Sequence, residues 1–258
     1  MVRQALIIEY DGSAFSGWQR QPDARSVQSC VESALSKVAD HEVQTICAGR
    51  TDAGVHALGQ VIHFDTDATR SARSWCLGAN THLPSDVSVV WAGAVADDFS
   101  ARYSAVERSY RYRILNCSNR AALQHRRAWF FPEKLDVERM RLATRALLGK
   151  HDFSAFRAAN CQARTAVREV SRAELDACGD EIVLHVSANA FLMNMVRIIT
   201  GVLVTIGTGE QAPQWVEELI SHGDRTRSGL TAPPEGLYLV QVRYPAQHAI
   251  PMRSGTCI

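Results

Sequence analysis

A polar triplet between two glycines is the first candidate for chemistry in this chain. The segment GRTDAGVHA (residues 49–57) carries Arg50 and Asp52, and it separates two stretches with the composition of β-strands. Glycine lets a loop follow backbone paths that are closed to other residues, so such a loop can approach a ligand closely. A carboxylate presented there could act as a nucleophile or as a base. A hairpin-like turn with a surface ion pair would explain Arg50 and Asp52 if they stood alone.

Two other segments combine residue types that have chemical uses. Tyr110 and Tyr112 stand two apart in the segment RSYRY, so on a strand their side chains share a face. One could stack on a flat ligand while the other packs, and an ordinary core tyrosine is the alternative for Tyr110. Arg197 lies in the most apolar stretch of the chain, where an unpaired charge is costly. This position favours a paired, functional role for Arg197.

The distribution of charge indicates a phosphate-rich partner. The formal net charge is only +1, but residues 100–172 hold 14 Arg and 2 Lys against 6 acidic residues. Guanidinium groups bind phosphate bidentately and stack on bases, so this clustering is typical of nucleic-acid binding. An arginine-rich composition spread over solvated faces is the alternative. As a group, nine arginines are expected to contact phosphates: Arg102, Arg108, Arg111, Arg113, Arg126, Arg127, Arg157, Arg164 and Arg168.

The composition argues against several other classes of protein. Seven cysteines form no CxxC pair and nine histidines form no HExxH motif, so we expect reduced thiols in a cytoplasm and no metal site. The first apolar run, residues 5–8, is too short for a signal peptide and is followed by acidic residues. Residues 190–207 are apolar but include Asn194 and Arg197, which predicts a buried helix and no membrane span.

The periodicity of the apolar residues predicts the elements that position these side chains. In the first half, strands are predicted at residues 5–10, 43–48, 60–64 and 87–95, and helices at 27–38, capped by Ser26, and at 73–80. The second half repeats this order, with strands at 108–115, 168–175, 182–187 and 237–243, and helices from Asp136 to Gly149, at 191–206 and at 213–221. The sequence therefore predicts an α+β fold of two ferredoxin-like (βαββαβ-type) halves, residues 1–104 and 105–258, with an extended antiparallel sheet.

Seven sequence blocks stand in a characteristic order along the chain. They are YDG with the later GWQ near the start, GRTDAGVHA, FSARYSA, RSYRY, HDFSAF, NAFLMNMVR and APPEGLYL. Together they resemble the tRNA pseudouridine synthase A family, from about residue 3 to about residue 245, and GRTDAGVHA is highly specific. In one local departure, this chain has Met193, Asn194 and Met195 where the family often carries histidine.

The resemblance implies a pseudouridine synthase fold and a role for five residues. Asp52 corresponds to the catalytic carboxylate, and Arg50 corresponds to the residue that helps displace and hold the flipped nucleotide. Tyr110 corresponds to the ring that stacks on the target base, and Leu237 to an apolar wall of the base pocket. Arg197 corresponds to the arginine that pairs with the aspartate. The first half would carry the catalytic loop, and the second half the RNA-binding and base-pocket residues. The resemblance also implies a homodimer without metal or other cofactor. Its substrate would be tRNA, with uridines 38, 39 and 40 of the anticodon stem-loop converted to pseudouridine.

The chemistry of this isomerisation accounts for the residue types. The N1–C1′ bond breaks, the uracil turns, and a new bond forms through C5. A carboxylate could attack C6 of the base, attack C1′ of the sugar, or abstract a sugar proton, and the residues leave all three routes open. A nearby arginine would favour the ionised carboxylate that burial opposes. The target nucleotide must leave its stack, and an aromatic platform recovers part of the lost stacking energy.

Two other functions fit parts of the same pattern. A non-catalytic RNA-binding protein would explain the arginines and tyrosines, but it would leave Arg50, Asp52 and Arg197 without a reason. A carboxylate-dependent glycoside hydrolase usually needs a second acid at short range, and GRTDAGVHA supplies only one. Asp11 in YDG could be that second acid, although a tight turn after a strand is its expected role.

Overall fold

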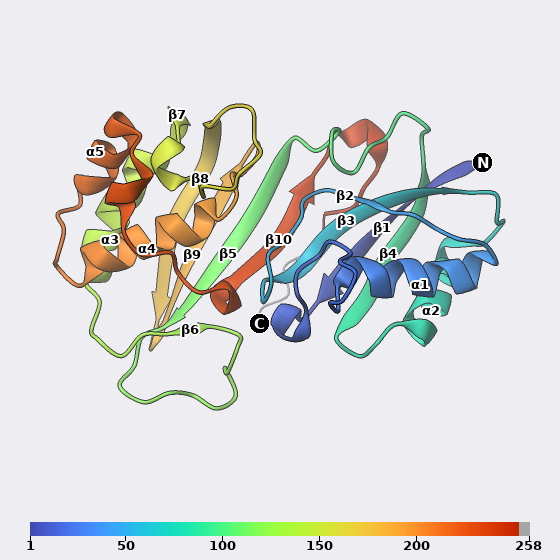
Figure 1. Ribbon diagram of the computed structural model, residues 1–258, viewed down its shortest axis with the longest axis horizontal. Coiled ribbons are helices and arrows are strands. Elements are labelled where there is room, and N and C mark those ends of the chain that lie inside the picture. Colours follow the sequence, from blue (N-terminus) through green and yellow to red (C-terminus); the bar gives the residue numbers. More distant parts are fainter. Residues whose placement is uncertain (253–258) are drawn as a thin grey trace. The chain divides into compact units, whose positions relative to one another are not determined.

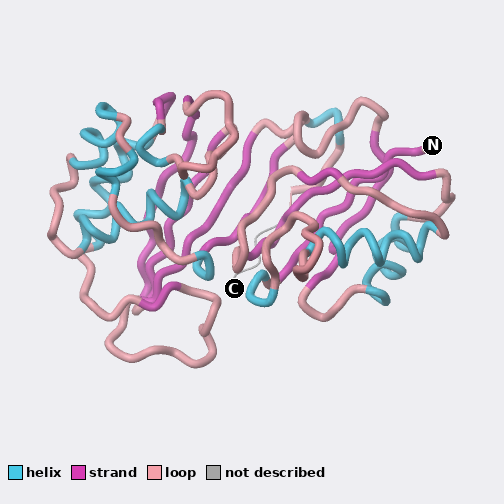
Figure 2. The backbone as a smooth tube through the Cα atoms, in the orientation of Figure 1, coloured by secondary structure: helices cyan, strands magenta, loops and turns pink. Residues whose placement is uncertain are grey.

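The chain forms two compact units in a computed structural model that describes residues 1–252. The first unit consists of Met1–Glu107 together with the described residues from Tyr238 onward, and the second consists of Arg108–Leu237. Each unit combines helices with a sheet, so the predicted α+β class is confirmed. Figure 2 shows the loops between these elements, including a long one over residues 116–128 of the second unit.

The sheet of the first unit is built around its longest strand. The strands are β1 (Val2–Tyr10), β2 (Ile46–Cys47), β3 (His56–Thr66), β4 (Val87–Val95) and β10 (Leu237–Arg243). β1 lies between β4 and β3 and is antiparallel to both. The side chains of β3 are buried along almost its whole length, which places β3 at the centre of this unit's core.

Two strands share the second edge of β3. β2 pairs antiparallel with it through Ile46 and Cys47, whereas β10 pairs parallel with it at the other end, Tyr238 with His56 and Leu239 with Ala57. Of the strand predicted at residues 43–48, only Ile46 and Cys47 form a strand in the structure. Its first part bonds to a helix instead, because the N–H of Val43 donates to the Ser36 hydroxyl. The chain that leaves this edge after β2 is the candidate catalytic loop.

Helices α1 (Val27–Ala39) and α2 (Ala72–His82) complete the first unit. Each begins after a serine whose hydroxyl accepts a hydrogen bond from the backbone three residues on, Ser26 for α1 and Ser71 for α2. α1 packs beside α2, and α2 contacts β4 (Figure 1). Trp75 of α2 is fully buried with its ring edge-on to Phe64 of β3, so the helix is fixed to the sheet by apolar contact.

The sheet of the second unit is mostly antiparallel, as predicted. Its strands are β5 (Glu107–Leu115), β6 (Trp129–Phe130), β7 (Gly149–Asp152), β8 (Val167–Cys178) and β9 (Glu181–Ala188). Their order is β5-β9-β8-β7, and β6 pairs parallel with β5. The sequence did not predict β6 and β7, which are only two and four residues long.

Three helices pack in the second unit: α3 (Val137–Thr144), α4 (Met195–Gly207) and α5 (Trp215–His222). α3 contacts both α4 and β8 (Figure 1). α3 begins at the predicted cap, Asp136, but ends at Thr144, and Gly149 starts β7 with a φ of 95°. α4 is the predicted buried helix, and no described helix is long and apolar enough to cross a membrane.

The start of α4 differs from its predicted position. The apolar pattern places the first residue at Phe191, but the helix begins four residues later, at Met195. Asn194 has a φ of 60°, in the left-handed region, and this conformation interrupts any helix that runs through it. Phe191 consequently lies in the loop before α4, where its ring can meet residues of the sheet.

Candidate active site

The Asp52 loop, residues 48–55, is held by the backbone of the segment after β1. The Trp18 N–H donates to the Thr51 carbonyl (3.0 Å), and the Gly54 N–H donates to the Phe15 carbonyl (3.3 Å). Within the loop the Val55 N–H donates to the Asp52 carbonyl (3.2 Å) and closes a turn. These bonds fix the path of the backbone on both sides of Asp52.

Thr51 is the buried member of the polar triplet. Its side chain is 8% exposed, and its Oγ1 lies 2.7 Å from the hydroxyl of Tyr10, the last residue of β1. Arg50 is exposed and Asp52 is half-buried. The anchored threonine therefore holds the loop while its two charged neighbours remain at the surface of the first unit. Sequence reasoning assigned no role to Thr51 or Tyr10.

The start of β3 forms a second support for the loop. The Gly12 N–H lies 3.1 Å from Nδ1 of the buried His56, and the His56 ring stacks on Tyr238 of β10 with centroids 4.6 Å apart. Asp11 accepts a hydrogen bond from the Ser13 N–H (3.0 Å) and caps a 3-10 turn, Gly12–Ala14. The turn role expected for Asp11 is thus confirmed.

Two glycines allow the segment after β1 to approach the loop closely. A Cβ at Gly12 would lie 2.0 Å from the Val55 carbonyl oxygen, and one at Gly17 would lie 2.8 Å from the Thr51 carbonyl oxygen. Gly17 also has a φ of 99°, which side chains rarely tolerate. The glycines of YDG and of GWQ therefore have a physical task in this chain, which is to let the backbone lie directly against the Asp52 loop.

Gly12→Ala is expected to displace the Asp52 loop. The added methyl group would meet backbone that cannot rotate away, so we expect the free energy of unfolding to fall by about 1–3 kcal/mol and the rate of product formation to fall by about tenfold. Urea unfolding and single-turnover kinetics measure the two effects. Ala14→Ser, at an exposed position of the same turn, is the control and should leave both unchanged. Wild-type stability and rate in Gly12→Ala would show that the close approach is unimportant.

Tyr110 and Tyr112 have different surroundings in the second unit. Tyr112 is fully buried and its hydroxyl donates to the Pro233 carbonyl (2.7 Å). Burial, followed by the charge of Glu235, raises the pKa of Tyr112 well above its ordinary value, although Arg197 acts in the opposite direction. This hydroxyl therefore stays protonated and remains a donor. Tyr112 packs, as one of the two tyrosines was expected to do.

Tyr110 is half-buried, and its ring meets a second aromatic ring. Phe191, in the loop before α4, lies edge-on to it, with ring centroids 5.0 Å apart and planes at 80°. This geometry is favourable for two aromatic rings, and it restricts the orientations open to Tyr110. The sequence placed Phe191 inside a helix, so this pair could not be predicted from it.

Arg197 joins α4 to the chain that leads into β10. Its Nε donates to the Ala232 carbonyl (2.8 Å), and the Ala232 N–H donates back to the Arg197 carbonyl (3.0 Å). Its Nη1 donates to Oδ1 of Asn194 (3.0 Å). The chain comes so close here that a Cβ at Gly201 would lie 2.0 Å from the Leu230 carbonyl oxygen. Arg197 consequently has a structural task in addition to any role in chemistry.

Arg197→Leu should weaken the second unit measurably. The variant leaves the Ala232 carbonyl without its side-chain donor, and hydrogen bonds from charged groups contribute about 1.5–3 kcal/mol each. We expect the free energy of unfolding, measured in urea, to fall by about 3–6 kcal/mol for the two bonds. Arg172→Leu is the matched control, because the Arg172 guanidinium pairs with Glu174 at the exposed surface. This variant should change the free energy of unfolding by less than about 1 kcal/mol. Equal stability of the two variants would contradict the task assigned to Arg197.

Leu237 ends the second unit after a tightly packed turn. The 3-10 turn Pro234–Gly236 precedes it, and a Cβ at Gly236 would lie 2.6 Å from both the Arg113 carbonyl oxygen and the Tyr112 ring. Leu237 is only 7% exposed. The chain directly before Leu237 therefore lies tightly against Tyr112 and the backbone of Arg113.

The predicted site residues fall into two groups. Arg50 and Asp52 lie on one loop of the first unit, and Tyr110, Arg197 and Leu237 belong to the second unit. In the second unit, residues 232–236 connect Arg197 with Tyr112 and lead to Leu237. Among residues 1–252, no group of three or more His, Cys, Asp or Glu side chains is placed to hold a metal ion. The roles of the five residues stay predictions at this point.

The arginines predicted to contact phosphates differ in their surroundings. Arg113 is buried and its Nε donates to Glu181, whereas Arg108 and Arg111 are half-buried. Arg157 donates to the carbonyls of Cys161 (2.6 Å) and Ala163 (2.8 Å), and Arg168 donates to the Thr165 carbonyl (2.9 Å). Both therefore shape the loop between them. Four others have exposed side chains: Arg102, Arg126, Arg127 and Arg164.

Comparisons with known proteins agree on one family. The family described as tRNA pseudouridine synthase matches residues 6–104 and 143–245 of the chain. The tRNA pseudouridine synthase A of Pseudoalteromonas atlantica is 52% identical over 250 residues, which cover 97% of this chain and 95% of that protein. Those of Alcanivorax borkumensis and Coxiella burnetii are each 50% identical and cover 97% of this chain and 94% and 96% of their own lengths.

Proposed function

This chain belongs to the tRNA pseudouridine synthase family, and we propose that its targets are uridines 38, 39 and 40 in the anticodon stem-loop of tRNAs. The enzyme is an isomerase that converts uridine to pseudouridine in tRNA. The narrower target follows from the resemblance of the seven sequence blocks to the tRNA pseudouridine synthase A family.

We propose that Asp52 is the carboxylate that acts on the flipped uridine. The observation that supports it most is the anchoring of the Asp52 loop by backbone bonds from Trp18 and to Phe15, with Thr51 buried beside Asp52. A reacting group on a loop held in this way needs little reorganisation before it reacts. In the same proposal Arg50, exposed on this loop, holds the displaced nucleotide.

We propose that residues of the second unit receive the base. Tyr110 stacks on the uracil, and its ring is oriented by the edge-on contact with Phe191. Leu237 forms an apolar wall of the base pocket, and Arg197 pairs with Asp52 and favours its ionised form. The net reaction needs no oxidant and no hydrolysis, because the proton lost from C5 and the proton gained at N1 balance.

The quaternary structure and location of the enzyme are also proposals. We infer that the protein acts as a homodimer in the cytoplasm, as the resemblance to the tRNA pseudouridine synthase A family implies. Light scattering at working concentrations should give the mass of two chains. A mass equal to one chain, with full activity, would contradict the dimer.

Tritium release tests the proposed target directly. A tRNA transcript labelled with tritium at uridine C5 loses the label to water when C5 becomes bonded to the sugar. We expect release by the wild-type protein, and loss of release when uridines 38, 39 and 40 are all replaced by cytidine. Unchanged release from the replaced transcript would show that the targets lie elsewhere in tRNA.

A further inference from the structure

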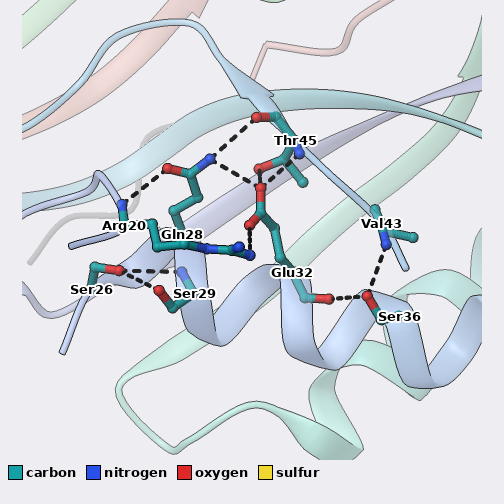
Figure 3. Close-up of polar contacts among 8 residues, drawn as sticks. All are labelled: Arg20, Ser26, Gln28, Ser29, Glu32, Ser36, Val43 and Thr45. Carbon is teal, nitrogen blue, oxygen red and sulfur yellow. Dashed lines mark hydrogen bonds and ion pairs between the residues drawn. The ribbon is translucent and has the colours of Figure 1, made fainter. Parts of the chain in front are cut away.

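Glu32 is a buried carboxylate that the proposed chemistry does not use. It lies on α1 and is only 3% exposed. Its Oε1 accepts three hydrogen bonds, from the Thr45 N–H (2.8 Å), the Thr45 hydroxyl (3.0 Å) and the Gln28 side-chain amide (3.0 Å). Its Oε2 pairs with the guanidinium of Arg20 (Figure 3). A buried carboxylate is costly unless it is paired and hydrogen-bonded, and here both conditions are met.

One arm of this network leads to the residue before Asp52. The Arg20 N–H donates to Oε1 of Gln28 (3.1 Å), and the Gln28 N–H donates to the Trp18 carbonyl (2.9 Å). Trp18 in turn donates its N–H to the Thr51 carbonyl. The segment that anchors the Asp52 loop is thus itself attached to α1, at Gln28 directly and at Glu32 through Arg20.

The other arm leads to the point where the loop begins. Thr45 directly precedes β2, and the Asp52 loop starts directly after β2. The Thr45 carbonyl also accepts a weaker bond from the Gln28 side chain (3.4 Å; Figure 3). Both chain segments that hold the loop, residues 18–20 and residues 45–47, therefore meet at the carboxylate of Glu32.

We propose that Glu32 is a positioning residue for the Asp52 loop. Its carboxylate fixes the separation between the segment that bonds to Thr51 and the strand from which the loop departs. Four donors converge on its two oxygens, so a change at Glu32 shifts both supports together. This inference rests on the proposed role of Asp52, and its test is arranged so that the two can fail separately.

Glu32→Gln is the decisive variant. Glutamine has nearly the shape of glutamate, but it replaces one acceptor oxygen by an NH₂ donor. Arg20 and Thr45 both offer donors to Glu32, so one arm of the network is broken whichever way the amide turns. We expect the single-turnover rate, at enzyme concentrations that saturate the tRNA, to fall about 10- to 100-fold because the loop is misplaced. The dissociation constant for the same tRNA should change less than about threefold.

Ser36→Ala is the matched control on the same helix. The Ser36 hydroxyl donates to the Glu32 carbonyl (2.7 Å) and accepts from the Val43 N–H (2.9 Å), so it also ties α1 to the chain before β2 (Figure 3). Ser36 lies one turn after Glu32 on α1, and its bonding partner Val43 lies two residues before Thr45. Ser36→Ala should lower the thermal midpoint but leave the single-turnover rate within about twofold of wild type.

The outcomes separate this inference from the proposed function. Loss of rate in Glu32→Gln with normal rate in Ser36→Ala supports it, whereas equal losses in both, or no loss in Glu32→Gln, overturn it. If Glu32→Gln does not fold, Thr45→Val decides, because it removes only one hydroxyl donor: a reduced rate supports the inference and an unchanged rate overturns it. Asp52→Asn is run beside them, and full activity in that variant would instead refute the role of Asp52.

Discussion

Asp52→Asn is expected to abolish the formation of pseudouridine in tRNA while the affinity for tRNA stays nearly unchanged. Asparagine has the shape of aspartate but cannot act as a nucleophile or as a base. The loop should keep its path, because the bonds that anchor it come from backbone groups and from Thr51. Removal of an essential catalytic group typically costs about 10⁴-fold or more in rate, so we expect a loss of at least that size.

The measurement is tritium release from C5-labelled tRNA under single-turnover conditions, with filter binding of the same tRNA. Asp23→Asn removes the same charge at an exposed position of the first unit and is the control. It should match the wild-type protein in both assays. Product from Asp52→Asn at more than about one-hundredth of the wild-type rate would contradict the proposed role.

Tyr110→Ala is expected to cause a large loss of catalytic efficiency. The variant removes the ring proposed to stack on the target base, and such stacking contributes about 1–3 kcal/mol per base. Phe191 also loses the ring that it meets edge-on. We therefore expect kcat/KM for tRNA to fall by about 10- to 100-fold.

Tyr110→Phe is the matched variant, because it keeps the ring and the contact with Phe191 and removes only the hydroxyl. It should retain most of the wild-type kcat/KM. Complete inactivity of Tyr110→Phe would show that the hydroxyl takes part in the reaction. Wild-type kinetics in Tyr110→Ala would remove the stacking role.

The sequence predicted elements well where local pattern alone decides. The strands at residues 87–95 and 237–243 have the predicted bounds, and Ser26 and Asp136 cap the helices expected after them. It failed at β2, because the Val43 N–H bonds to the Ser36 hydroxyl of α1 instead of to a strand, and no strand pattern records a bond to the preceding helix. It also misplaced the start of α4, since a left-handed Asn194 interrupts an otherwise helical apolar pattern.

The candidate site could be predicted only in part for a similar reason. Its five residues came from sequence blocks, but the contacts that hold them are tertiary. The burial of Thr51 and the close approach at Gly12 depend on two segments about forty residues apart, which no periodicity reports. The importance of Glu32 could have been inferred from the sequence, because Gln28, Glu32 and Ser36 form a polar row at intervals of four along α1, beside its apolar face. A helix row of this kind ordinarily faces water, and here it faces the chain that leads to the loop.

The pairing of β10 with β3 has a consequence for the synthesis of the protein. The ribosome makes the Asp52 loop and β3 before the second unit, but the neighbours of His56 and Ala57 on the shared edge, Tyr238 and Leu239, are made only after it. While the second unit is being synthesised, the nascent first unit lacks the strand beside the base of the loop, and His56 lacks the ring on which it stacks. The first unit is therefore begun before the second unit but completed after it, and the candidate catalytic loop gains its full support only once the second unit has been synthesised.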